Sequence, residues 1–192
     1  DSYEFGQEGL TRLLLERGAH YDISVAAARG DFARVTELLA RDPALANDPS
    51  NGLSPLGWAG YGQDPGMVPF LVARGARVRD ELCCPCGTGN LEIARELVAC
   101  GADPDGLSPI WRARPLHVAA ALVYTSENVP MVEWLLGLGA DVNGRAADGA
   151  TTPLDVAVRR AAEVAGGDAR RERGFQRLIA LLTARGGVRG GS

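Results

Sequence analysis

The stretch that decides the fold runs from Pro115 to Asn143 and reads PLHVAAALVYTSENVPMVEWLLGLGADVN. It opens with Pro-Leu-His and a run of small residues, and it closes with Gly-Ala-Asp after a leucine-rich segment. Proline is tolerated in the first turn of a helix, and a glycine after the last apolar residue is typical of a helix C-cap. The stretch therefore predicts a short helix, a connection, and a second amphipathic helix that ends at a glycine.

The closing phrase recurs along the chain. Gly-Ala pairs stand at residues 18–19, 75–76, 101–102 and 139–140, a weaker Gly-Gly stands at 186–187, and a Leu/Val doublet precedes each. Self-similarity at roughly 25 to 50 residues indicates stacked supersecondary units. Each unit holds two helices that are too short to be stable alone, so the units must stack to bury their apolar faces.

The wording P-L-H-x-A-A … L-L-x-x-G-A-D-V-N resembles the ankyrin repeat, in a degenerate, bacterial-type form. The resemblance is specific at Pro115–Asn143, looser at Ser54–Ala59 and Thr152–Ala157, and weakest around Cys83–Gly89. It implies an all-α ankyrin-repeat solenoid of about five helix-turn-helix units with a partial unit at the N-terminus. We expect one domain over residues 1–186, with units near 1–22, 21–47, 48–79, 80–105, 106–143 and 144–186, and we expect residues 187–192 to fray.

Helix signals within the units differ in strength. We expect helices at Glu8–Arg17, Ile23–Arg29, Phe32–Arg41, Pro55–Tyr61, Gly66–Arg74, Asn90–Cys100, Pro153–Ala165 and Gly174–Ala184. A proline and two glycines in Cys83–Gly89 predict a distorted or partly unwound turn there. Gly166–Arg173 reads as a polar insertion before the last helix.

Composition excludes several classes of function. The net charge is −4 and all 20 basic residues are arginine, so no basic face for nucleic acid is indicated and Schiff-base or phosphate-loop lysines are absent. No apolar run reaches the ~18–20 residues of a membrane span. The cysteine spacing is unlike a disulfide framework, so we expect a cytoplasmic protein. We also expect a monomer and no cofactor.

The cysteines and the histidine admit structural interpretations. In ankyrin repeats the histidine at the position of His117 ties neighbouring loops by hydrogen bonds, which the resemblance favours over a catalytic role. Cys83 and Cys86 have C-x2-C spacing, but the common zinc sites add a second such pair or two histidines, which Cys84 and Cys100 do not supply, so we expect no metal. The repeat register turns Cys83 and Cys86 toward neighbouring layers, whereas Cys84 faces the groove and is the one thiol expected to react.

The same register implies where a ligand would bind, because ankyrin arrays build a concave face from their first helices and hairpin tips. The ligand-binding candidates are Trp58, Tyr61, Cys84 and Leu122 on that face, Trp111 and Arg112 in the long fifth hairpin, and Tyr124 in an insertion at 123–130. Trp, Tyr and Arg dominate interface hot spots. The alternative is that Trp58 and Tyr61 pack on each other and fill space left by a glycine-rich helix.

Two hypotheses of function follow. The first is a non-catalytic binding module that takes an apolar peptide or a partner's helix in an aromatic groove. The second is an enclosed pocket above ~300 Å³ for a hydrophobic small molecule, serving a carrier or a cofactor-independent cyclase or isomerase. For that enzyme the polar candidates are Tyr61, Asp22, Arg112 and His117. A third possibility is a module cut from a longer chain, because residues 1–22 resemble only the second half of a unit.

Overall fold

The computed structural model describes residues 21–49, 52–121 and 128–190. The predicted helix Glu8–Arg17 and the candidates Leu122 and Tyr124 lie outside these residues. Within the described ranges the chain is helical and has no strand, and its one isolated bridge joins Ser108 to Ala113. This confirms the all-α prediction.

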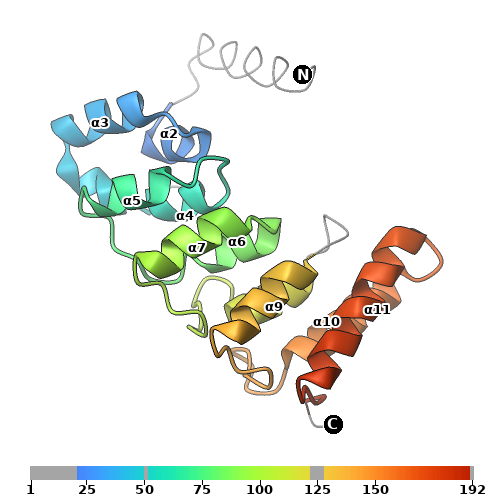
Figure 1. Ribbon diagram of the computed structural model, residues 1–192. Helices are drawn as coiled ribbons and strands as arrows, with labels where there is room; N and C mark the ends of the chain where they lie inside the picture. The colour runs from blue at the N-terminus through green and yellow to red at the C-terminus, as the bar shows by residue number, and fades with distance from the viewer. Residues whose placement is uncertain (1–20, 50–51, 122–127, 191–192) are drawn as a thin grey trace.

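The described helices fall into pairs, each with a first and a second helix. The first helices are α2 (Ile23–Arg29), α4 (Pro55–Gly60), α6 (Cys83–Thr88), α8 (Pro115–Ala121) and α10 (Pro153–Val164). The second helices are α3 (Phe32–Arg41), α5 (Met67–Val72), α7 (Leu91–Ala99), α9 (Val129–Gly137) and α11 (Ala169–Ala184), and a 3-10 helix spans Pro43–Asn47. Each first helix contacts its own second helix and the first helix of the next pair, and the pairs follow one another in chain order in Figure 1.

The core is a row of small layers between these pairs. First helices contribute alanines such as Ala26, Ala59 and Ala119, whose small side chains allow neighbouring helices to approach closely. Second helices contribute fully buried leucines, of which Leu97 and Leu135 are examples. Burial of one such leucine stabilises the fold by about 1.5–3 kcal/mol. Because the buried residues form one cluster, each pair buries its apolar face against its neighbours.

Local caps fix where the helices begin and end. Among the described α-helices, side-chain oxygens cap six at their N-termini, and the capping residues are Asp22, Asp31, Ser54, Asn90, Thr152 and Asp168. The repeated glycines Gly75, Gly101, Gly139 and Gly186 have φ angles of 95°, 100°, 92° and 85°. A side chain at such a φ is strained, so these positions need glycine, as the repeat pattern predicts.

Two local predictions were wrong. Cys83–Thr88 is a regular helix, because Pro85 lies in its first turn, where backbone N–H groups have no partner within the helix. The segment 166–173 is not wholly an insertion, since α11 already begins at Ala169. Asp168 caps that helix by accepting hydrogen bonds from the N–H groups of Arg170 and Arg171.

The segment after α11 makes specific contacts as far as residue 190. The Val188 N–H donates to Asn143 Oδ1 at 2.8 Å, and the Val188 carbonyl accepts from Thr152 Oγ1 at 2.9 Å. The Gly190 N–H donates to Asp155 at 2.7 Å, where fraying was expected. None of the helices in the described ranges has the length and apolar character needed to cross a membrane.

Candidate functional site

In the long fifth hairpin, residues 106–114, Ser108 both closes the hairpin and links it to the fourth unit. The Ser108 N–H donates to the Ala113 carbonyl at 3.0 Å, and Ser108 Oγ accepts from the Trp111 N–H at 3.1 Å. The same hydroxyl donates to Asp80 Oδ2. Beyond this anchor the hairpin displays apolar side chains, with Leu107 46% exposed and Ile110 57% exposed.

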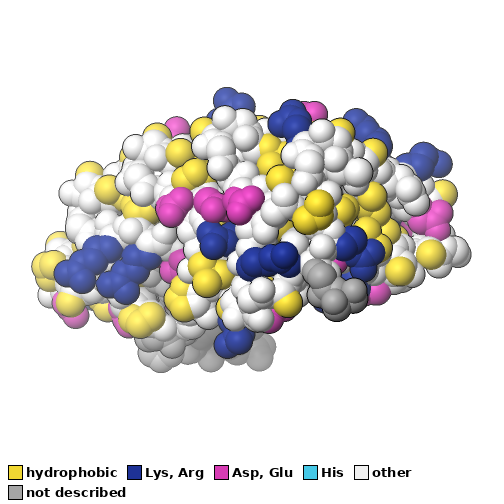
Figure 2. All heavy atoms as spheres, turned by 90° about the horizontal axis from the view of Figure 1, so that it is seen from below, with side chains coloured by type: hydrophobic (Ala, Val, Ile, Leu, Met, Phe, Trp, Pro, Cys, Tyr) yellow, Lys and Arg dark blue, Asp and Glu magenta, His cyan; other side chains and the backbone are white. Residues whose placement is uncertain are grey.

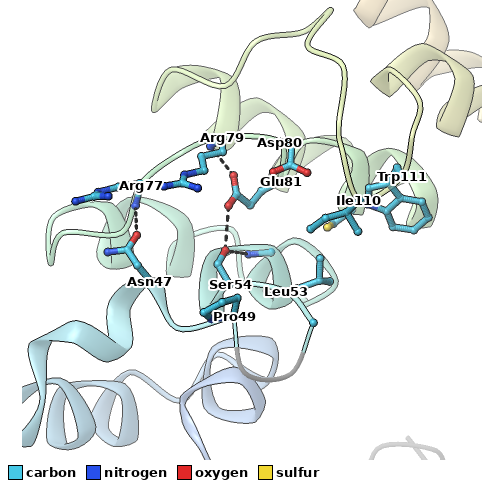
Figure 3. A pocket seen from close by; sticks show the side chains of 13 residues that line it. Asn47, Pro49, Leu53, Ser54, Arg77, Arg79, Asp80, Glu81, Ile110 and Trp111 are labelled. Carbon is cyan, nitrogen blue, oxygen red and sulfur yellow. Dashed lines mark hydrogen bonds between the residues drawn. The ribbon is translucent and has the colours of Figure 1, made fainter. Parts of the chain in front are cut away.

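A hollow of about 150 Å³ lies beside this hairpin. It is lined by Asn47, Pro49, Gly52, Leu53, Ser54, Gly57, Arg77, Arg79, Asp80, Glu81, Cys84, Ile110 and Trp111. In Figure 3 the side chains of Ile110 and Trp111 lie at one end, Arg77 and Arg79 lie at the other, and Glu81 lies between them. The hollow is therefore apolar at one end and basic at the other.

Hydrogen bonds fix the backbone around the hollow. Glu81 is 7% exposed, and its carboxylate accepts from Ser54 Oγ at 2.9 Å and from the Arg79 N–H at 2.6 Å. Asn47 accepts from the Arg77 N–H at 2.8 Å and donates to the Gly75 carbonyl at 2.8 Å. Asn47, from the second unit, therefore fixes the backbone at Arg77, and Glu81 links the backbone of Arg79 to Ser54 of the third hairpin.

The side chains of Arg77 and Arg79 point outward from this frame. Val78, between them, packs against the core, whereas both arginines are exposed. Among the described residues neither guanidinium has an ion pair or a hydrogen bond. This leaves two positive charges free at the rim of the hollow.

Cys84 lines the hollow but is not the reactive thiol that the repeat register predicts. It is only 1% exposed, and burial together with the nearby Glu81 and Asp80 carboxylates raises the pKa of its thiol to about 12. Interactions with Tyr61 and Trp111 have a smaller, opposite effect on that pKa. The thiol is therefore neutral and inert at neutral pH. Trp111, which we expected near this surface, lies beside Cys84.

Trp58 and Tyr61 lie next to the hollow and do not line it. Their ring centroids are 6.1 Å apart at a tilted angle, and each side chain is half-buried. Burial, followed by the contact with Cys84, raises the pKa of Tyr61. Tyr61, Cys84 and Trp111 are thus brought together, with Trp58 beside Tyr61. Trp58 and Tyr61 thus contact each other, as in the alternative in which they fill space beside a glycine-rich helix. Trp58 nevertheless stays partly exposed to solvent.

The other polar candidates have structural partners or lie at the surface. Asp22 caps α2 by accepting from the Val25 N–H at 3.0 Å. His117 is 2% exposed, and its Nε2 lies 3.1 Å from the Thr151 carbonyl oxygen, so it ties two loops as the resemblance implied. Burial lowers the pKa of His117. Arg112 is exposed at the hairpin tip with a φ of 51°.

The described residues include no group of three or more His, Cys, Asp or Glu side chains arranged to hold a metal ion. All four cysteines are free thiols. Burial raises the pKa of Cys83 and of Cys86, which suits their placement between layers.

Sequence reasoning missed several residues of this site, among them Leu107, Ile110, Arg77, Arg79 and Glu81. The sequence could have indicated Ile110, because it adjoins Trp111 in a hairpin longer than the others. Glu81 had a weaker signal, since an acidic residue stands at the repeat position where α4, α8 and α10 begin with proline. The free arginines had none, because their importance depends on which neighbours leave them unpaired.

Comparison with known proteins agrees with the fold. Residues 114–147 match the model of the ankyrin repeat family. This match, with the paired helices around it, supports an ankyrin-repeat protein. A search of curated proteins found no match to this chain.

Proposed function

We propose that the chain is a non-catalytic module that binds a partner protein along its fifth hairpin and the adjoining aromatic groove. Ankyrin repeats generally mediate binding between proteins. The proposed contacts are Trp58, Tyr61, Cys84, Trp111 and Arg112, joined by Ile110 and Leu107 from the same hairpin. Leu122 and Tyr124 stay further candidates outside the described residues.

One observation carries this proposal: Ile110 is 57% exposed beside the half-buried Trp111, over a hollow. Exposed apolar patches mark interaction sites, and Trp is one of the residues enriched at interface hot spots. Covering the exposed part of Ile110 would contribute about 1 kcal/mol from burial alone. In the part of the chain that the structure describes, Ile110 is not among the side chains packed against the core, so its exposure favours a binding role.

The size of the hollow favours binding over the second hypothesis. At about 150 Å³ it is smaller than the ~300 Å³ of common small-molecule sites. It accommodates one or two side chains of a partner more readily than a whole hydrophobic metabolite. An enzyme that cyclises or isomerises such a metabolite is therefore the alternative with less support.

Surface charge favours a protein over nucleic acid as the partner. On the face seen in Figure 2, the described arginine side chains are interspersed with acidic and apolar ones. Nucleic-acid sites usually carry a continuous basic field instead. Four free thiols also fit the reducing cytoplasm that the cysteine spacing suggested, and we place the module there.

The test is a selection of binders from a displayed library of random dodecapeptides on the folded chain. Selected peptides should lose affinity for Ile110→Ser and for Trp111→Ala, by about tenfold each. Leu138→Ser is the matched control, because Leu138 is similarly exposed (42%) but follows α9, away from the hairpin. Equal loss with Ile110→Ser and Leu138→Ser, or no selected peptides, would overturn the proposal.

A further inference from the structure

The hollow beside the fifth hairpin has a charge pattern that the binding proposal does not use. Its apolar end is formed by Ile110, Trp111, Leu53 and the neutral thiol of Cys84. Its other end carries Arg77 and Arg79, whose backbones are fixed by Asn47 and Glu81. Because the backbone at both arginines is already ordered, binding a ligand there loses less conformational entropy than binding to a mobile loop would.

The two acidic residues of the hollow do not neutralise these arginines. Glu81 is buried, and its two oxygens already accept hydrogen bonds from Ser54 and from the Arg79 backbone. Asp80 accepts from the Ser108 hydroxyl. Both carboxylates are thus committed to tying loops, whereas both guanidinium groups face solvent. An acidic group entering the hollow itself would meet these carboxylates, so it is accepted only at the arginine rim.

The volume limits what the apolar end can hold. About 150 Å³ fits one large aliphatic or aromatic side chain. A partner segment crossing the hollow would place that side chain against Ile110 and Trp111, and its next residues would reach Arg77 and Arg79. Carboxylates are the side chains that an arginine pair recognises with directed hydrogen bonds.

We infer that this hollow binds an acidic–apolar peptide segment, with one large apolar side chain beside Ile110 and Trp111 and one or two Asp or Glu side chains on Arg77 and Arg79. The inference rests on the proposed function and specifies its partner. Association is electrostatically steered, so its affinity falls as salt screens the arginines.

The experiment uses the same dodecapeptide selection on the full chain. Enriched peptides should pair Asp or Glu with a nearby Leu, Ile, Phe or Trp. The double variant Arg77→Glu/Arg79→Glu should lower their affinity about tenfold or more, and a second selection on this variant should lose the acidic bias. Thermal unfolding checks that the double variant is folded, which the exposure of both side chains favours.

The matched control is Arg95→Glu/Arg173→Glu. Both residues are exposed, lie outside the hollow, and undergo the same change in net charge, so affinity should change by less than about twofold. Peptides without acidic bias, peptides with basic bias, or equal losses for the two double variants would overturn the inference. If selected peptides depend on Ile110 but not on the arginines, this inference fails while the proposed function stands. Dependence on neither overturns both.

Discussion

The fifth and third units tie themselves to the next unit in different ways. In the fifth, His117 Nε2 reaches the Thr151 carbonyl, two residues before the proline that begins the next first helix. In the fourth, Cys83 occupies the histidine position and its thiol donates to the Ala113 carbonyl at 3.9 Å. In the third, the position is Gly57, which has no side chain. The link at this repeat position is therefore strong in the fifth unit, weak in the fourth and absent in the third.

The third unit replaces the lost link with a buried carboxylate. Ser54, just before α4, donates to Glu81, two residues before α6, so these side chains join the two loops. Gly57 also lines the hollow, and a Cβ at this position would lie 3.2 Å from Leu53 Cβ and 3.7 Å from Glu81 Cγ. The hollow therefore lies where this unit lacks the histidine of the repeat pattern.

Breaking the histidine link should give the largest effect. His117→Ala removes a buried ring and leaves the Thr151 carbonyl without this partner, so we expect a loss of about 3 kcal/mol in the free energy of unfolding. Cys83→Ala removes one buried sulfur and a weaker hydrogen bond, so its loss should be about 1 kcal/mol. Urea unfolding followed by circular dichroism measures both.

Only variants with an unchanged m-value are comparable in that measurement, because repeat arrays can unfold in more than one step. Equal losses of stability for His117→Ala and Cys83→Ala would contradict our conclusion that the His117 link is the stronger of the two.

The glycines of the middle units give the next effect. A Cβ at Gly60, the last residue of α4, would lie 2.8 Å from Cys84 Cβ and 3.2 Å from Pro85 Cδ. Gly60→Ala should therefore cost about 1–3 kcal/mol. Gly137 ends α9 in the same way but has no atom within 4 Å of its added Cβ, so Gly137→Ala should stabilise by up to about 1 kcal/mol.

A rescue attempt sharpens this prediction. Cys84→Ala keeps the Cβ that clashes, so it should not restore the stability of Gly60→Ala. Thermal unfolding of the three variants tests the set. A stabilising Gly60→Ala would mean that α4 and α6 have room to separate.

A smaller effect is expected from pH. Burial lowers the pKa of His117 below the 6.5 of an unfolded histidine, so the folded state favours the neutral ring. Around and below pH 6.5 the unfolded chain binds more protons than the folded chain. The free energy of unfolding therefore decreases as the pH is lowered, until the pH is below the folded pKa of His117. Wild type should lose more stability between pH 7 and pH 5 than His117→Gln does.

The chain has one other histidine, His20, so both measurements are made in a His20→Gln background. Identical pH profiles for the two proteins would show that the His117 ring titrates as it does in the unfolded chain.

Most of the fold was readable from sequence because its signals are local. The bounds of α2 and α3 were predicted to the residue, since Asp22, Gly30 and Asp31 mark their ends. The start of α11 was missed because the cap Asp168 lies in a charged run with a later glycine. The helix α6 was missed because the same proline that breaks a helix interior is harmless in a first turn.

The candidate site was less predictable because it depends on contacts between distant residues. Cys84 is buried in the folded chain, and Trp111, 27 positions further along, lies beside it. Tyr61 and Trp111 were expected near each other, and both interact with Cys84. The basic rim could not be predicted, because it requires knowing that Glu81 is already paired with Ser54.

The smallest effect compares the hairpin tips. The third and sixth have glycines with positive φ, Gly52 at 83° and Gly149 at 70°, whereas the fifth has Arg112 at 51°. A side chain in this region is strained, so Arg112→Gly should raise the free energy of unfolding by up to about 1 kcal/mol. Arg112→Ala keeps the strain and should give no gain. Thermal unfolding measures both variants.

The same two variants separate strain from function at that tip. If Arg112 contacts a partner, Arg112→Gly and Arg112→Ala should both weaken the selected peptides, although only the first is more stable. The fold would then retain a strained residue because its guanidinium is used in binding. A destabilised Arg112→Gly would instead show that the arginine stem packs on the hairpin, and the tip would differ from its two glycine counterparts for reasons of packing alone.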